Sequence, residues 1–351
     1  MHAPGRRRSL RRTLLPIALL AVTAAACGGA EESAGPTAPE GDGASTVTVY
    51  TGRHYGIESV FESFTAATGI EVRFTTGSDP ELRERLAAEG GNTPADLIMT
   101  ADAANIALAA AAGLLAPLDS DVLRAAIPAE LRAEDGSWYA LSRRLRVIQY
   151  STERIAAPPT TYAELGDPQY DGRLCLRPST HPYTQSLVAA LIRNEGADEA
   201  ERIVAAWVAN DPAYINSDTD MLRAIATGDC DVALANSYYL GRLKVLEDAD
   251  FPVAISWPDQ VGAGAHVNIS AAAVTAAASN PDGARVLLEW LATDGQQEFS
   301  DANFEYPAAI GVEPAAVLVG FGEFVADDAS VRELGALNAA AVDLLAEVGY
   351  E

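Results

Sequence analysis

Basic side chains and sulfur ligands are both scarce in this chain. Its 351 residues include 24 Lys and Arg against 49 Asp and Glu, which gives a formal net charge of −25. Such an acidic chain disfavours nucleic acid and anionic surfaces, because these bind proteins through clustered Lys and Arg. The three cysteines and four histidines form no close cluster in the sequence, so we expect no thiolate metal site.

Common enzyme signatures are also missing from the chain. It has no G-x-S-x-G motif, no H-E-x-x-H motif and no pair of histidines with a third metal ligand nearby. We find no internal repeat at the period of a solenoid protein. The sequence therefore predicts a binding protein rather than an enzyme.

The N-terminus has the pattern of an export signal. Five arginines within residues 6–12 precede an apolar stretch over residues 14–26, which is too short to span a bilayer. This stretch ends in Ala-Ala-Ala before Cys27 and resembles a bacterial lipoprotein cleavage site. We predict a signal peptide at residues 1–26 and a lipidated Cys27 at the cell surface or in the periplasm. Ordinary secretory cleavage nearby is the alternative.

The next segment and the remaining cysteines fit an exported protein. Residues 27–45 are rich in Gly, Pro, Ser and Glu, and they predict a flexible linker between a lipid anchor and the folded part. Cys175 and Cys230 are the cysteines that remain after Cys27. An oxidising compartment favours one disulfide between them, and two separate buried thiols are the alternative.

Strand and helix patterns alternate through the folded part. After a β-rich run at residues 47–50, apolar residues from Ile57 to Phe64 recur at i, i+3, i+4 and i+7, which predicts a helix. Asp79-Pro80 marks the start of another helix. The alternation resumes in the second half with strands at residues 173–177 and 231–235. The predicted fold class is α/β, with parallel strands and helices on the sheet faces.

Two segments without a helical period, residues 138–150 and 261–270, interrupt this alternation. We interpret them as crossovers between two α/β lobes that close on a ligand by hinge motion. The predicted lobe boundaries are residues 46–140 and 266–320 for lobe 1, and residues 141–265 and 321–351 for lobe 2.

Tyrosines follow three of the predicted strands. Ligands of open α/β sheets bind outside the carboxyl ends of the strands, where Tyr55, Tyr183, Tyr238 and Tyr239 are placed. The residues just before Tyr238 are good N-caps, so this adjacent pair falls in a first helical turn. Successive helical residues lie about 100° apart around the axis, so both phenols can face one cleft.

Several phenols in one cleft suit a hard, highly charged cation. Phenol keeps its proton up to a pKa near 10, but such a cation displaces the proton and binds the phenolate. Fe(III) matches oxygen ligands of this kind, whereas softer ions favour Cys or His and Ca or Mg favours carboxylates. The alternative is that the tyrosines pack lobe surfaces or stack on a sugar or an amine.

Eight stretches of the sequence match a known family in the family's order and cover essentially the whole folded part. They are YTGRHY (50–55), PADLIMTADAANI (94–106), LSRRLRVIQY (141–150), GRLCLRPST (172–180), YTQSL (183–187), GDCDVALANSYYLGR (228–242), HVNIS (266–270) and NFEYP (303–307). Together they resemble the periplasmic ferric-iron-binding proteins of bacterial iron ABC transporters, in the tyrosine-rich cyanobacterial branch. The resemblance implies a two-lobe type II periplasmic-binding-protein fold with Fe(III) in the interlobe cleft.

The resemblance also implies an iron ligand set. Tyr55 from lobe 1 and Tyr183, Tyr238 and Tyr239 from lobe 2 match the family's iron ligands. His54 is implied as a fifth ligand, although members of the family differ in whether this histidine coordinates.

Other charged residues near the matched motifs have implied roles. Arg144 matches an arginine near the iron of relatives and would offset the net negative charge of four phenolates around Fe(III). We expect Arg53 to face solvent or a carboxylate, and His181 and His266 to be structural. Asp102 is offset by one residue from an acidic ligand of some relatives, so we do not expect it to bind iron.

The implied role is capture and delivery by a monomer. Lobe 2 tyrosines would bind iron first, lobe closure would add the lobe 1 ligands, and the closed form would dock on a permease driven by an ATPase. A sugar, polyamine or oxyanion in the same cleft is the alternative.

Overall fold

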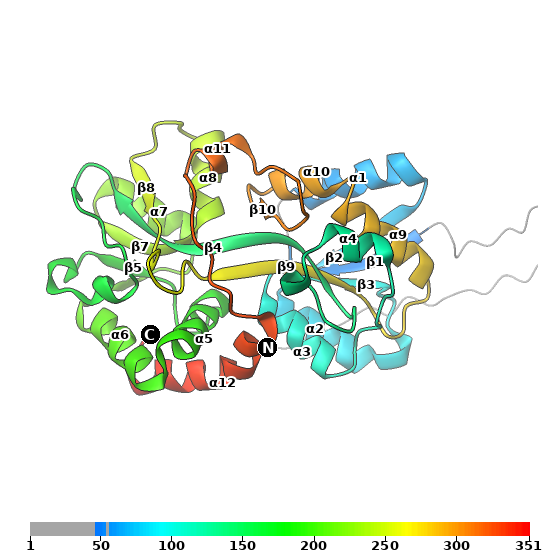
Figure 1. The fold of residues 1–351 in the computed structure, drawn as a ribbon, viewed down its shortest axis with the longest axis horizontal. Coiled ribbons are helices and arrows are strands. Elements are labelled where there is room, and N and C mark those ends of the chain that lie inside the picture. The colour runs from blue at the N-terminus through cyan, green and yellow to red at the C-terminus, as the bar shows by residue number, and fades with distance from the viewer. Residues whose placement is uncertain (1–45, 54–55) are drawn as a thin grey trace, which may run out of the picture. The chain divides into compact units, whose positions relative to one another are not determined.

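A ten-stranded sheet organises the computed structural model, which describes residues 46–53 and 56–351 (Figure 1). The strand order is β2-β1-β3-β9-β4-β7-β5-β6, and β8 and β10 also pair with β4. The strands are β1 (Thr46–Thr51), β2 (Glu71–Thr76), β3 (Leu97–Thr100), β4 (Tyr139–Ser151), β5 (Leu174–Leu176), β6 (Ala213–Tyr214), β7 (Val232–Asn236), β8 (Val253–Ser256), β9 (Val267–Val274) and β10 (Tyr306–Pro307). The predicted signal peptide, Cys27 and the linker lie outside the described residues.

Helices cover the faces of this sheet (Figure 1). They are α1 (Ile57–Thr68), α2 (Asp79–Glu89), α3 (Ala103–Ala111), α4 (Asp121–Ala126), α5 (Pro182–Glu195), α6 (Ala197–Ala209), α7 (Asp218–Thr227), α8 (Ser237–Leu246), α9 (Pro281–Ala292), α10 (Gln296–Asp301), α11 (Ala316–Val319) and α12 (Val331–Glu347). Within the described part of the chain, no helix is both long and apolar enough to cross a bilayer.

The start of α2 shows how local sequence sets the helix ends. Asp79-Pro80 correctly predicts the position, but Ser78 rather than Asp79 is the N-cap. The Ser78 hydroxyl accepts a hydrogen bond from the Glu81 amide, and the Glu81 carboxylate accepts one from the Ser78 amide. This reciprocal capping box satisfies two amides that the helix leaves unpaired.

β4 runs through both halves of the sheet. Its residues 139–145 pair with β9, and residues 146–150 pair with β7. The prediction of parallel strands holds in each half, where β1 pairs with β2 and β3, and β5 pairs with β6 and β7. It is wrong at the centre, because β9 runs antiparallel to both β3 and β4.

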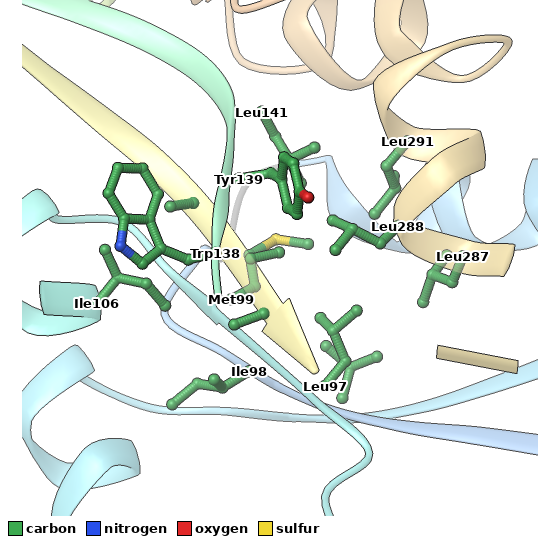
Figure 2. Close-up of a cluster of buried hydrophobic side chains, with 14 of the residues drawn as sticks. Leu97, Ile98, Met99, Ile106, Trp138, Tyr139, Leu141, Leu287, Leu288 and Leu291 are labelled. Atoms are coloured by element: carbon green, nitrogen blue, oxygen red, sulfur yellow. The ribbon is translucent and has the colours of Figure 1, made fainter. Parts of the chain in front are cut away.

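The first core packs on both faces of β3, β4 and β9. Consecutive residues of a strand point to opposite faces. Figure 2 accordingly shows Trp138 beside Ile106 of α3, whereas Tyr139 points towards the leucines of α9. All three of these side chains are buried. The sheet is thus covered by α3 on one face and by α9 on the other.

The second core surrounds β5 and β7 with α5, α6 and the last helix, α12. The α12 helix contacts α5 and also α3 of the first core. Its first residue, Val331, belongs to the first core, and Leu334, Leu344 and Leu345 belong to the second. The last helix therefore connects the two cores.

Cys175 and Cys230 form a disulfide, as predicted, with their Cα atoms 5.9 Å apart. Cys175 lies in β5, which precedes α5, and Cys230 lies just before β7, which precedes α8. The bridge therefore braces the two strands that lead to Tyr183 and to the Tyr238–Tyr239 pair.

Removing this bridge should destabilise the protein. The variant with both Cys175→Ser and Cys230→Ser should lose about 2–4 kcal/mol of unfolding free energy, because a crosslink between distant residues restricts the unfolded chain. Urea unfolding followed by circular dichroism measures the loss. A reductant should lower the midpoint of the wild type but leave that of the double variant unchanged. An equal effect of the reductant on both proteins would contradict the prediction.

Candidate functional site

Tyr238 and Tyr239 lie in the first turn of α8, which begins at Ser237 directly after β7. Tyr238 is 3% exposed, and Tyr239 is partly exposed. Their ring centroids are 4.0 Å apart and the ring planes are inclined by 30°. Two adjacent phenols on a strand would point to opposite faces, so the change from strand to helix is what brings these rings together.

Tyr183 lies in the first turn of α5, and its side chain meets Tyr238 in a hydrogen bond. His181 fixes this turn. Its Nδ1 accepts a hydrogen bond of 3.1 Å from the Tyr183 amide, and its ring packs edge-on against the Tyr183 ring at 4.5 Å. The structural role that we expected for His181 is therefore an N-cap that places Tyr183.

Burial raises the pKa values of both Tyr183 and Tyr238 above the ordinary value for tyrosine. The neighbouring Tyr183 and Tyr239 raise the pKa of Tyr238 further, whereas Arg144 lowers the pKa of both phenols. Both phenols consequently stay protonated at neutral pH in the metal-free protein. Only a strongly charged cation can favour their phenolate forms there.

Arg144 lies on β4 beside these phenols and is 1% exposed. Its guanidinium carbon is 5.3 Å from the centroid of the Tyr183 ring. Nη1 donates to Ser270 Oγ at 2.9 Å, Nη2 donates to the Ile269 carbonyl at 3.3 Å, and Nη1 lies 3.8 Å from Glu305 Oε1. Burial lowers the pKa of Arg144, but the neighbouring Tyr183 and Glu305 outweigh burial and leave it raised. Arg144 is therefore a fixed cation next to Tyr183.

His54 and Tyr55 lie outside the described residues, but the adjacent Arg53 is described. Arg53 is 3% exposed and forms an ion pair of 3.1 Å with Glu305. Its guanidinium also lies over the Phe299 ring, 3.8 Å from the centroid. We expected Arg53 to face either solvent or a carboxylate, and in the structure it faces the Glu305 carboxylate.

Asp102 and His266 have partners within the fold. Asp102 caps α3, since its Oδ1 accepts from the Ala104 amide at 2.9 Å, and its Oδ2 accepts from Asn268 Nδ2 at 2.8 Å. His266 is buried, and its Nε2 is 3.0 Å from Ser186 Oγ. Burial lowers the pKa of His266 to about 3, so its ring is neutral at physiological pH.

Acidic or histidine-rich metal sites are missing from the described part of the chain. No group of three or more His, Cys, Asp or Glu residues there could hold a metal ion. The Tyr238 ring lies against that of Tyr239, its side chain bonds to Tyr183, and Arg144 lies over the Tyr183 ring, so phenol groups gather beside a cation in this region. Their chemistry suits a trivalent cation rather than Ca or Zn.

Comparison with known proteins decides the family. Residues 59–324 match the family described as bacterial extracellular solute-binding protein. The chain belongs to this family. The expectation of a binding protein rather than an enzyme is thereby confirmed.

Related proteins are similar to this solute-binding protein over most of its length. It is 36% identical over 316 residues to iron uptake protein A1 of Synechocystis sp., a match that covers 87% of each chain. A Trichodesmium protein solved in complex with iron and citrate ligands is 38% identical, with a TM-score of 0.81 and coverage of 87% of this chain and 100% of that one. The ferric binding protein from Campylobacter jejuni is 32% identical, with a TM-score of 0.82 and coverage of 87% and 100%. These structures confirm the α/β periplasmic-binding-protein fold.

Sequence reasoning missed two groups of charged residues in this solute-binding protein. One is Glu305, which lies within the quoted NFEYP stretch. The other is Arg146, whose guanidinium carbon lies 5.9 Å from the centroid of the Tyr183 ring and which forms a buried ion pair with Asp218. Strand alternation could have found Arg146, because Arg144 and Arg146 must share one face of β4. No local signal connects Glu305 to its partners.

Proposed function

We propose that this solute-binding protein captures Fe(III) outside the cytoplasm and delivers it to the permease of an iron ABC transporter. The observation that carries the proposal is the convergence of Tyr183, Tyr238 and Tyr239 beside the buried cation Arg144. The names of the relatives, iron uptake protein and ferric binding protein, support the same ligand.

The proposed ligand set comprises these three tyrosines together with Tyr55, and His54 as a fifth ligand. Four phenolates around Fe(III) leave one net negative charge in a partly dry site, which is costly without a counterion. Arg144 supplies that counterion at a fixed place, because Ser270 and the Ile269 carbonyl hold its guanidinium. Acid, which reprotonates phenolates, and reduction to Fe(II), which binds phenolate more weakly, would both favour release.

The proposed cycle uses the two predicted lobes, residues 46–140 with 266–320 and residues 141–265 with 321–351. Iron would bind first to Tyr183, Tyr238 and Tyr239, and closure would bring Tyr55 and His54 to it. The closed monomer would then dock on the permease, which an ATPase drives, while a lipidated Cys27 keeps the protein at the membrane. The separate first and second cores support two bodies of this kind.

Titration of the mature protein with ferric citrate tests the ligand. Fe(III) bound to phenolate absorbs visible light by charge transfer, so the solution should turn orange-red. Tyr239→Phe should weaken the band by about a quarter, because one of four phenolates is lost. Tyr214→Phe is the matched control, since Tyr214 packs against Tyr350 in the second core and should leave the band unchanged. A colourless wild-type mixture without bound iron would refute the proposed function.

A further inference from the structure

Glu305 is a buried carboxylate with partners from distant parts of the chain. It lies just before β10 and is 3% exposed. A buried carboxylate is costly unless it is paired and hydrogen-bonded. Its described contacts come from Arg53 Nη1 (3.1 Å), Asn303 Nδ2 (2.6 Å), Ser270 Oγ (3.4 Å), the Ser142 hydroxyl and Arg144 Nη1 (3.8 Å).

The two arginines on Glu305 are each next to proposed iron ligands, one in the sequence and one in the structure. Arg53 is followed directly in the sequence by His54 and Tyr55, two of the proposed ligands. Arg144 lies over the Tyr183 ring of the second core. The Glu305 carboxylate therefore contacts both arginines, and each arginine is next to some of the proposed ligands.

A third connection runs from Glu305 to α8. Asn303, which donates to Glu305, accepts a hydrogen bond of 3.2 Å from Arg242 Nη1, one turn after Tyr238 on α8. Phe304, between Asn303 and Glu305, has a φ of 52°, a left-handed conformation that is uncommon for a bulky residue. This turn packs closely on α8, because a Cβ added to Gly241 would lie 3.2 Å from the Phe304 Cβ.

The charges explain why a carboxylate is needed at this place. Two buried guanidinium groups that share one neighbourhood repel each other, and each would seek other partners without an anion between them. Glu305 lies within ion-pair distance of both. Because Ser270 Oγ bonds Arg144 Nη1 at 2.9 Å and Glu305 Oε2 at 3.4 Å, the position of Arg144 follows that of Glu305.

We propose that Glu305 is a positioning residue for iron capture, which holds Arg53 and Arg144 in one arrangement and so fixes Arg144 beside Tyr183. The inference rests on the proposed function and extends it to a residue that touches no iron ligand in the described contacts. Glu305 acts through the arginines. Its loss should therefore alter the iron complex more than it alters the fold.

The test compares Glu305→Gln with Glu298→Gln in the mature protein. The Gln side chain keeps the shape of Glu305 but removes its charge. Glu298 is a matched control, because it lies on the neighbouring α10 and bonds to Ser63 at 3.0 Å. For Glu305→Gln we expect a displaced charge-transfer band and iron transfer to a competing chelator that is about 10-fold faster or more, as for other outer-sphere partners of metal sites. Glu298→Gln should match the wild type in both measurements.

Two further variants keep the test decisive. Glu305→Asp retains the charge on a shorter side chain. Compared with Glu305→Gln, it should return the band part of the way to its wild-type position and slow the iron transfer. Asn303→Ser removes a hydrogen bond to the carboxylate and should shift both readouts in the same direction as Glu305→Gln, by less. If Glu305→Gln fails to fold, these two variants decide. The inference would be overturned if the folded variants showed the band position and the transfer rate of the wild type. A wild-type protein that binds no Fe(III) would instead refute the proposed function.

Discussion

Iron retention should fall steeply when the pH drops from about 7.5 to about 5.5. Burial raises the pKa values of Tyr183 and Tyr238 in the metal-free protein, so these phenols hold their protons until iron displaces them. Each displaced proton changes the apparent affinity about 10-fold per pH unit. The proposed ligand set has four phenols, so the apparent affinity should change by about 10,000-fold per pH unit.

The direction of this pH effect on iron binding follows from which state of the protein binds the protons. The metal-free phenols are protonated across this whole pH range, whereas the iron complex has lost those protons, so acid favours the metal-free state. Folding itself should be almost insensitive to these tyrosines here, because they are protonated in the folded and the unfolded chain alike. Protonation of these tyrosines would thus release iron without itself destabilising the fold.

Competition with a chelator of known affinity at each pH measures this slope. Tyr239→Phe should reduce the slope by about one unit of log affinity per pH unit, because one proton fewer is displaced. Tyr214→Phe should keep the wild-type slope. An affinity that does not change between these pH values would contradict phenolate binding.

Arg144→Gln should weaken iron binding by about 10- to 100-fold, the usual cost of losing an outer-sphere partner of a metal site. Arg144 lowers the pKa values of Tyr183 and Tyr238, so its loss makes both phenolates harder to form. It also leaves the net negative charge of the iron complex without its proposed counterion. The pH of half-release should therefore rise in the same variant.

Arg143→Gln is the matched control for this substitution. Arg143 is the preceding residue of β4, and its Nε donates to the Pro307 carbonyl at 3.2 Å, on the opposite face of the strand from Tyr183. The Arg144→Gln variant should still fold, because Glu305 keeps its ion pair of 3.1 Å with Arg53. Equal iron affinity of the two variants would leave Arg144 with a purely structural role.

Features set by neighbouring residues could be predicted from the sequence. The placement of Tyr238 and Tyr239 in a first helical turn follows from the change between strand and helix patterns, and the structure confirms it. The helix start near Asp79-Pro80 follows likewise from local rules, apart from the identity of the cap. The α/β class is correct for the same reason.

Features set by distant contacts could not be predicted in this way. Arg53 and Glu305 are 252 residues apart in the chain, and no periodicity reports that they meet. The antiparallel course of β9 depends on which strands become neighbours, which residue pattern alone does not specify. The lobe boundaries and the roles of His54, Tyr55 and Cys27 stay predictions.

The position of α12 has a consequence for the order in which the chain folds. Leu334, Leu344 and Leu345 complete the second core, yet they come from the last helix of the chain. A chain that is synthesised N-terminus first can therefore bury the apolar side chains around β5 and β7 fully only after α12 has been made. The strands and helices that carry Tyr183 and Tyr238 would then be held in place only once the whole chain is available.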